Sequence, residues 1–151
     1  MQPDIYTVNI KNKSSEAFNF KWNATAKTNY SNPLKYLYEP NAAILKSGSF
    51  GLISEEFKVE KLQKHTHLFT SDSLENFPGR RFIIEQVIPY SKSEIRKNIN
   101  FKTANITTRN FPEDVFTLRK KWKISEGGDR YLFFTTIENK KKIVIVCKKA
   151  T

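Results

Sequence analysis

Residues 80–89 read Arg-Arg-Phe-Ile-Ile-Glu-Gln-Val-Ile-Pro, a run of alternating apolar residues that opens with two arginines and closes with a proline. Alternation with a period of two predicts a β-strand, because successive side chains of a strand point to opposite faces. Pro89 ends the run, since proline has no N–H to donate to a neighbouring strand. The segment therefore predicts a strand over 81–88, and the same pattern recurs on both sides of it.

The rest of the chain repeats this period over short segments separated by turns. Strands are predicted at 5–10, 17–22, 35–39, 43–45, 49–53, 57–62, 66–70, 115–123, 130–138 and 142–148. A short helix is predicted over 91–98, where Ser91 can cap the first turn and Glu94 stands at the third helical position. Residues 25–34 and 91–111 are polar enough to be loops. Many short strands without a long helix predict an all-β sandwich.

The composition is that of a globular protein. The chain has 151 residues, of which 38% are hydrophobic and 13% aromatic, so we predict a single domain over residues 1–151 with one sizeable core. Its one cysteine, Cys147, excludes an internal disulfide and a thiolate zinc site. No apolar run approaches the roughly 20 residues that cross a bilayer, and the first residues do not resemble a secretion signal. We expect a cytoplasmic protein without a membrane span.

Residues that could carry out chemistry are few. His65 and His67 could share one face of a strand, but no third metal ligand is evident, so they are interpreted as surface histidines. The adjacent acidic pairs at 55–56 and 113–114 would point to opposite faces of a strand and cannot form an acid/base pair. Neither a glycine-rich phosphate loop nor an activated nucleophile is found. The sequence therefore predicts no catalytic residue, no metal site, no cofactor and no enzymatic activity.

The positive charge lies mostly in the second half of the chain. The net charge is +11; residues 1–79 hold 9 basic and 8 acidic side chains, whereas residues 80–151 hold 17 and 7. Such an excess attracts acidic partners, which include nucleic acid, anionic lipid and acidic peptides. A solvated basic face with no specific ligand is the alternative.

Several segments, taken in order along the chain, resemble the major sperm protein (MSP) domain family. Residues 35–49, Lys-Tyr-Leu-Tyr-Glu-Pro-Asn-Ala-Ala-Ile-Leu-Lys-Ser-Gly-Ser, are similar to the central motif of that family. The other matching segments are 12–15, 18–26, 80–85, 119–122 and 126–128. The resemblance implies an immunoglobulin-like, seven-stranded MSP-type β-sandwich of the nematode kind. The first strand of that family has no counterpart here, so we predict that residues 143–146 add an extra C-terminal strand at the edge of the sandwich.

The MSP resemblance also implies a function. The family consists of non-enzymatic protein–protein interaction or scaffold domains, so the expected partner is a protein, an acidic peptide or a second copy of the chain. In one branch a basic groove holds acidic peptides, and the groove positions correspond to Lys21, Thr25, Arg81 and Ile83 of this sequence. With the neighbouring Arg80, these residues form the predicted partner-binding site.

Nucleic-acid binding through the basic second half is the alternative function. Phosphate contacts would come from Arg80, Arg81, Arg96, Lys97, Arg119, Lys120, Lys121, Lys123 and residues 140–142. Phe101, Phe111 and Tyr131 could stack on bases. Steep weakening of binding with salt would distinguish this function from recognition of a protein partner.

Overall fold

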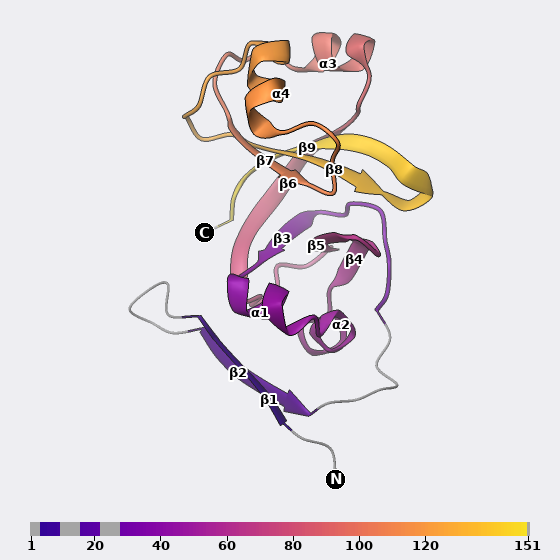
Figure 1. Cartoon of the computed structure of the whole chain (residues 1–151), viewed down its shortest axis with the longest axis vertical. Coiled ribbons are helices and arrows are strands. Elements are labelled where there is room, and N and C mark those ends of the chain that lie inside the picture. The colour runs from indigo at the N-terminus through magenta and orange to yellow at the C-terminus, as the bar shows by residue number, and fades with distance from the viewer. Residues whose placement is uncertain (1–3, 10–15, 22–27, 151) are drawn as a thin grey trace.

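The computed structural model of the protein describes residues 4–9, 16–21 and 28–150 (Figure 1). Its strands are β1 (Asp4–Asn9), β2 (Glu16–Lys21), β3 (Tyr36–Pro40), β4 (Glu60–Gln63), β5 (Thr66–Ser71), β6 (Gly79–Pro89), β7 (Asn105–Arg109), β8 (Tyr131–Ile137) and β9 (Lys141–Lys149). Its helices are α1 (Ala42–Ser47), α2 (Phe50–Phe57), α3 (Lys92–Asn98) and α4 (Val115–Trp122), with a 3-10 turn at Glu138–Lys140. The chain is therefore a mixed α/β protein.

Seven of the strands form one sheet in the order β4-β5-β3-β6-β9-β8-β7. Neighbours run antiparallel except β7 and β8, which are parallel. Parallel neighbours need a crossover connection, and α4 lies in the connection between these two strands. β1 and β2 pair with each other in a separate two-stranded sheet.

The core consists of three clusters of buried side chains. The α1–α2 cluster, beneath those helices, contains Tyr38, Ile44, Ile53, Val59, Phe69 and Phe77. The α3–α4 cluster contains Ile88, Ile95, Ala104, Ile106, Leu118, Ile124, Leu132, Phe134, Val144 and Val146. The inner cluster contains Leu37, Leu62, Leu68, Phe82, Phe133, Ile137, Ile143, Ile145 and Cys147. Strand alternation places the two helix-covered clusters on one face of the sheet and the inner cluster on the other.

β6 is an eleven-residue strand that both halves of the sheet share (Figure 1). It pairs with β3 through residues 79–83 and with β9 through residues 82–89. The register with β9 shifts between Ile84 and Gln86, so Glu85 forms a β-bulge. A bulge adds one residue to one strand and so reverses which side chains face each side. Before the bulge, Phe82 therefore belongs to the inner cluster and Ile84 packs against it, whereas Ile88 after the bulge belongs to the α3–α4 cluster.

The sheet curls around the inner cluster until its two ends meet. The hydroxyl of Thr66 on β5 donates to the carbonyl of Thr136 on β8 at 2.5 Å. The side-chain amide of Asn110, which follows β7, donates to Thr66 Oγ1 at 3.1 Å. Residues near one edge of the sheet thus hydrogen-bond to residues near the other edge, and the inner cluster is enclosed.

The predicted all-β immunoglobulin-like sandwich is wrong. The structure has a seven-stranded mixed sheet with helices on one face, beside the two-stranded sheet of β1 and β2. Residues 143–146 do form a strand, within β9, but β9 lies between β6 and β8 instead of at an edge. Residues 143–147 are all buried, so both faces of β9 are covered, as a central strand requires.

Residues 43–45 and 49–53, predicted as strands, form parts of α1 and α2. The side chain of Asn41 caps α1 by accepting the N–H of Ile44 at 3.0 Å, and Gly48 ends it in the left-handed conformation with φ of 65°. Helices this short have too few apolar positions to show a period of 3.6 residues. The search for alternation with a period of two missed these helices, whereas the capping residues indicate them.

Residues 115–123, also predicted as a strand, contain α4. Val115, Leu118 and Trp122 stand three or four residues apart and pack on the α3–α4 cluster, which is the helical spacing. Asp114 caps the first turn, where its side-chain oxygen accepts a backbone N–H at 2.8 Å. A cap followed by this spacing predicts a helix, and the alternation of Phe116 and Leu118 had concealed it.

The helix predicted over 91–98 is confirmed as α3, and Ser91 accepts the N–H of Glu94 at 3.3 Å as expected for its cap. The segment after it, predicted as a loop, contains β7. β7 reads Asn-Ile-Thr-Thr-Arg and buries only Ile106 among its five residues. A polar edge strand of this kind lacks the apolar alternation on which strand prediction depends.

Lys61 on β4 is a buried cation within the α1–α2 half. Its side chain is 2% exposed, its Nζ donates to the carbonyl of Lys64 at 2.5 Å, and the Nζ lies 4.5 Å from the ring centre of Phe50. Burial disfavours the charged amine and lowers the pKa of Lys61 from 10.5 to about 8.

Deleting Glu85 should prevent cooperative folding. The deletion removes an exposed side chain, but it shifts residues 86–89 by one position and turns Ile88 away from the α3–α4 cluster. Glu85→Ala keeps the bulge and is the matched control, with a thermal transition close to that of the wild type. A deletion variant that melts as cooperatively as Glu85→Ala would contradict the assigned role of the bulge.

The free energy of unfolding should rise between pH 8 and 10.5 through Lys61. The folded state releases the Lys61 proton near pH 8 and the unfolded state near 10.5, so the unfolded state binds more protons in this window and stability increases with pH. Allowing for solvent screening, the gain is about 1 to 2 kcal/mol. Urea unfolding across this range should show the gain in the wild type relative to Lys61→Met. Parallel curves for the two proteins would be inconsistent with a titrating Lys61.

Candidate functional site

α3 and α4 lie on the same part of the sheet, at the end of the molecule remote from β1 and β2 (Figure 1). α3 begins as soon as β6 ends, because Pro89 stops the strand and Ser91 caps the helix. α4 packs Leu118 on the core and carries Lys120 and Lys121 on its exposed side. The two helices therefore present cations from two separate stretches of sequence.

A hollow of about 470 Å³ lies where the two helices approach each other. We call it the α3–α4 pocket; its lining residues are Tyr90, Ser91, Lys92, Arg96, Lys121 and Trp122. It thus combines three cationic side chains with two aromatic rings. Cations that can reach phosphates, next to rings on which bases can stack, are the usual elements of a single-stranded nucleic-acid site.

The aromatic rings of this pocket are fixed by a hydrogen-bonded network. The hydroxyl of Tyr90 donates to Glu113 Oε1 at 2.5 Å, and Trp122 Nε1 donates to that hydroxyl at 3.4 Å. Lys121 Nζ pairs with the other oxygen of Glu113 at 3.1 Å. The ring of Phe111 also meets the Tyr90 ring edge to face, with centroids 4.9 Å apart. The rings are therefore held in place before any ligand arrives.

The same network sets the charge states of its members. Hydrogen bonding from Tyr90 lowers the pKa of Glu113, with Lys121 adding to the effect. Burial, together with the bond to Glu113, raises the pKa of Tyr90. Glu113 is therefore ionised and neutralises Lys121. Within the described part of the chain, Lys92 and Arg96 make no ion pair or hydrogen bond through their side chains, so their charges are available to a ligand.

The structure separates the basic residues predicted to contact phosphate into two groups. Lys97, Lys120 and Lys123 are exposed on or beside the two helices. Residues 140–142, at the end of the 3-10 turn and the start of β9, are exposed too. Arg119 instead donates to the carbonyls of Ala104 and Ile124 and stabilises the loop after α4. Contacts to protein carbonyls therefore occupy its guanidinium.

The predicted base-stacking residues are placed less favourably. Phe111 packs against Tyr90 and Phe134, and Tyr131 lies beneath Arg80. Phe101 is stacked under Arg130, with the guanidinium carbon 4.4 Å from the ring centre. Sequence reasoning did not identify Tyr90 or Trp122 as site residues. Their positions in the sequence could have indicated the site, because Tyr90 directly follows β6 and Trp122 ends α4, and both elements pack on the α3–α4 cluster.

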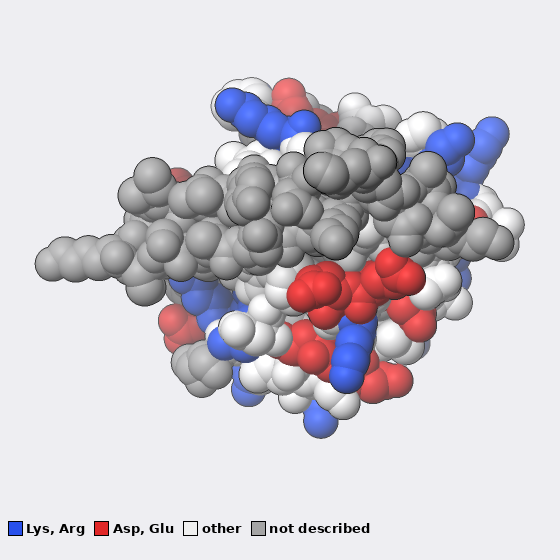
Figure 2. All heavy atoms as spheres, turned by 90° about the horizontal axis from the view of Figure 1, so that it is seen from below, with Lys and Arg blue, Asp and Glu red and all other residues white. Residues whose placement is uncertain are grey.

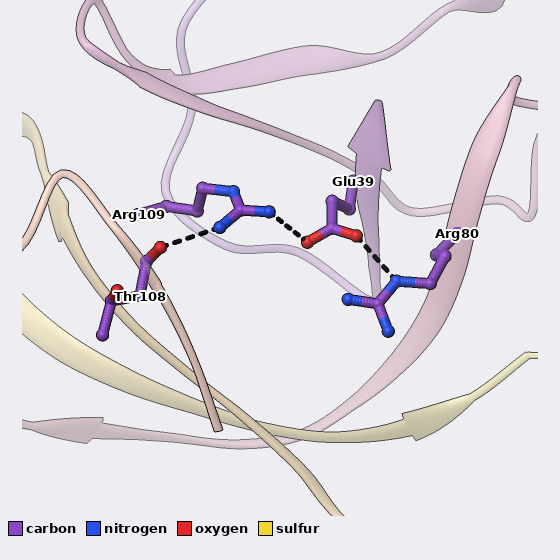
Figure 3. Close-up of polar contacts among 4 residues, drawn as sticks. All are labelled: Glu39, Arg80, Thr108 and Arg109. Atoms are coloured by element: carbon purple, nitrogen blue, oxygen red, sulfur yellow. Dashed lines mark hydrogen bonds and ion pairs between the residues drawn. The ribbon is translucent and has the colours of Figure 1, made fainter. Parts of the chain in front are cut away.

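A second charged group joins strands from the two halves of the sheet (Figure 3). Glu39 on β3 is 8% exposed and accepts from Arg80 Nε at 2.6 Å and from an Arg109 guanidinium nitrogen at 2.7 Å. Arg109, at the end of β7, also donates to the carbonyl of Thr108 at 2.9 Å. The hydrogen bond to Glu39 raises the pKa of Arg80. We call these three residues the Glu39 bridge; they connect β3, β6 and β7.

The predicted partner-binding residues do not all lie on one surface element. Arg80 belongs to the Glu39 bridge, and its neighbour Arg81 points to the opposite face of β6, where it donates to the carbonyl of Glu75 at 3.2 Å. Ile83 is partly buried on that same strand. Lys21 ends β2 in the separate two-stranded sheet, and Thr25 lies outside the described residues.

The opposite end of the molecule has a different surface. Figure 2 views it from below and shows acidic side chains gathered next to scattered basic ones. α2 contributes the exposed Glu55 and Glu56. α3 and α4 instead belong to the part of the chain with the basic excess, residues 80–151, which hold 17 basic and 7 acidic side chains.

Over residues 4–9, 16–21 and 28–150, no group of three or more His, Cys, Asp and Glu side chains is arranged to hold a metal ion. None of the helices in this part of the chain is long and apolar enough to cross a membrane.

Two family models match adjacent parts of the chain. Residues 36–78 match a ferredoxin-like domain, and residues 79–149 match a family described as THUMP domain-like. The boundary between them coincides with the start of β6. Curated proteins give no match.

A solved structure of similar fold comes from Porphyromonas gingivalis W83, where it is named a "putative methyltransferase". It has 34% sequence identity and a TM-score of 0.88 over 98% of this chain. The chain spans 38% of the length of that protein.

These similarities correct the function predicted from the sequence. The matches are to THUMP-like and ferredoxin-like domains and give no support to an MSP domain, so the MSP-like scaffold function is wrong. The prediction of a protein without enzymatic activity is contradicted by similarity to a protein named as a methyltransferase. The MSP resemblance was misleading because alternating strands with turns at similar spacings occur in unrelated sheets.

Replacing Glu39 should destabilise the fold more than replacing a surface acid. Glu39→Gln leaves two arginines facing each other beside a neutral group. We expect the free energy of unfolding to fall by about 2 kcal/mol. This loss is smaller than for a fully buried ion pair because the arginines are partly exposed. The control is Glu113→Gln, whose pair with Lys121 lies at the surface and should contribute under about 1 kcal/mol. Urea unfolding of both variants measures the difference, and equal losses would contradict a structural role for the Glu39 bridge.

Proposed function

We propose that the chain binds RNA through the face formed by α3 and α4, as the substrate-holding part of an RNA-modifying methyltransferase. THUMP domains bind RNA, and the THUMP-like match covers every element that forms this face. The observation that carries the proposal is the α3–α4 pocket, where the cations of Lys92 and Arg96 stand beside the rings of Tyr90 and Trp122.

The chemistry of the pocket suits a nucleotide. Lys92 and Arg96 would neutralise phosphates and release counterions, which supplies affinity without sequence preference. The ring of Trp122 would provide a stacking surface for a base, while Tyr90 keeps the ring in place through its hydroxyl. Glu113 neutralises Lys121, so the cations on α3 would provide the main attraction for phosphate.

Methyl transfer is proposed only for the whole protein. The region matched in the Porphyromonas gingivalis protein is 38% of its length, and that protein is the one named as a methyltransferase. The described residues would hold the RNA while the chemistry takes place elsewhere. We also propose that the protein is cytoplasmic, as the sequence predicts.

We further propose that the two matched regions fold as one unit, in keeping with the single domain predicted from the sequence. β3 lies in the ferredoxin-like match and β6 in the THUMP-like match, yet the two strands are hydrogen-bonded neighbours. The inner cluster also contains side chains from both regions.

Reversing the two available cations of α3 should weaken RNA binding. For Lys92→Glu/Arg96→Glu we expect roughly a tenfold or greater loss of affinity and a shallower dependence on salt, because each lost phosphate contact lowers the slope by about 0.7 for a single strand. Fluorescence anisotropy with labelled single-stranded and hairpin RNAs across a salt series measures both quantities.

The matched control for that experiment is Lys46→Glu/Lys64→Glu, which makes the same change in net charge on exposed residues outside the THUMP-like match. This variant should bind nearly as well as the wild type. If both variants lost affinity for RNA equally, the loss would result from the change in net charge, and the assignment of RNA binding to the α3–α4 face would be wrong. Failure of the wild type to bind either RNA would overturn the proposed function.

A further inference from the structure

A second hollow, of about 460 Å³, lies at the other end of α3. We call it the bulge pocket; its lining residues are Glu85, Gln86, Asn98, Asn100, Phe101, Arg130 and Val146. The α3–α4 pocket involves Lys92 and Arg96 of α3, whereas the bulge pocket involves its last residue, Asn98. α3 therefore contributes side chains to both pockets.

The polar groups of the bulge pocket are positioned but only partly used. Gln86 Nε2 donates to Asn98 Oδ1 at 3.0 Å, and Asn98 in turn donates to the carbonyl of Glu94 at 2.8 Å. This chain of contacts fixes two amides and leaves the carbonyl oxygen of Gln86 available as an acceptor. Within the described residues, the side chains of Glu85 and Asn100 make no hydrogen bond or ion pair.

One wall of the bulge pocket is a flat stacked pair. The guanidinium of Arg130 lies 4.4 Å from the ring centre of Phe101, and Phe101 is in turn packed against the α3–α4 cluster. Arg130 is exposed, so the outer face of its guanidinium plane is accessible. Unpaired bases stack on arginine planes as well as on aromatic rings, so this pair can serve as a platform.

The charge of the bulge pocket determines which part of a nucleotide it can hold. Glu85 is an acid in the strongly basic half of the chain, and the bulge places it in the wall of the pocket. Its carboxylate repels phosphate but accepts hydrogen bonds from N–H groups on the edge of a base. The neighbouring amides can both donate and accept at such an edge.

From this arrangement we infer that the bulge pocket binds one unpaired nucleobase that carries an exocyclic amino group. The base stacks on Arg130 and donates its amino group to Glu85. Adenine, cytosine and guanine have such a group, whereas the single N–H on the pairing edge of uracil lies between two carbonyl oxygens that repel the carboxylate, so the pocket discriminates against uracil. The inference rests on the proposed RNA-binding function and adds to it a base preference and the residues responsible.

The spacing of the two pockets extends the inference to the form of the RNA. α3 has seven residues and is roughly 10 Å long, which is about the length of three stacked nucleotides. A single strand lying along α3 would place one base in each pocket and its phosphates near Lys92 and Arg96. Bases of an intact duplex are paired and cannot enter either pocket, so the ligand is a single-stranded segment.

The test compares labelled oligo-rA, oligo-rC and oligo-rU by fluorescence anisotropy at one salt concentration. Wild-type protein should bind oligo-rA and oligo-rC about fivefold more tightly than oligo-rU, the equivalent of one hydrogen bond. Glu85→Ala should remove this preference by weakening the binding of the two amino-bearing oligomers, with no loss for oligo-rU. The control Glu55→Ala, an exposed acid on α2, should keep the wild-type preference.

A second variant tests the platform. Arg130→Gln removes the stacking plane and should weaken all three oligomers, while its thermal transition stays at the wild-type temperature. Wild-type protein that binds the three oligomers equally, or a Glu85→Ala variant that keeps the preference, would overturn the inference and leave the proposed function intact. Absence of binding to all oligomers and to the hairpin RNA would overturn both.

Discussion

One constraint on β6 governs the rest of the structure. The strand must bury side chains against the inner cluster at its start and against the α3–α4 cluster at its end, and these clusters lie on opposite faces of the sheet. A regular strand keeps alternate residues on one face throughout. The extra residue at Glu85 reverses this assignment, and a single strand can then belong to both halves.

The curl of the sheet follows from the same arrangement. Once the two halves share β6, the inner cluster can be enclosed only if the outer strands approach each other, and the contact between Thr66 and Thr136 shows that they do. The Glu39 bridge lies across this closure and joins β3 to β7, which are far apart in the order of the sheet. Arg80 therefore forms a structural ion pair that its position in a basic run did not indicate.

Closure also determines where a ligand can bind. The helices cover one face of the sheet and the other face is enclosed, and two of the hollows that remain at the surface lie around α3 and α4. The bulge pocket arises from this geometry, because the residue that reverses β6 also places a carboxylate in its wall. In this reading a single inserted residue both permits the fold and supplies the group that distinguishes bases.

The sequence by itself determined the local features: most strands, the cap at Ser91, the end of β6 at Pro89 and the basic excess after residue 79. Such features depend on residues close together in the chain, so their signals can be read there. Tertiary structure alone decided the order of the strands, the central place of β9 and the pairing of Arg80 with Glu39. Tertiary structure also decided which cations remain available to a ligand and which aromatic rings line a pocket. Both depend on contacts with residues distant in the sequence, which no local sequence pattern can indicate.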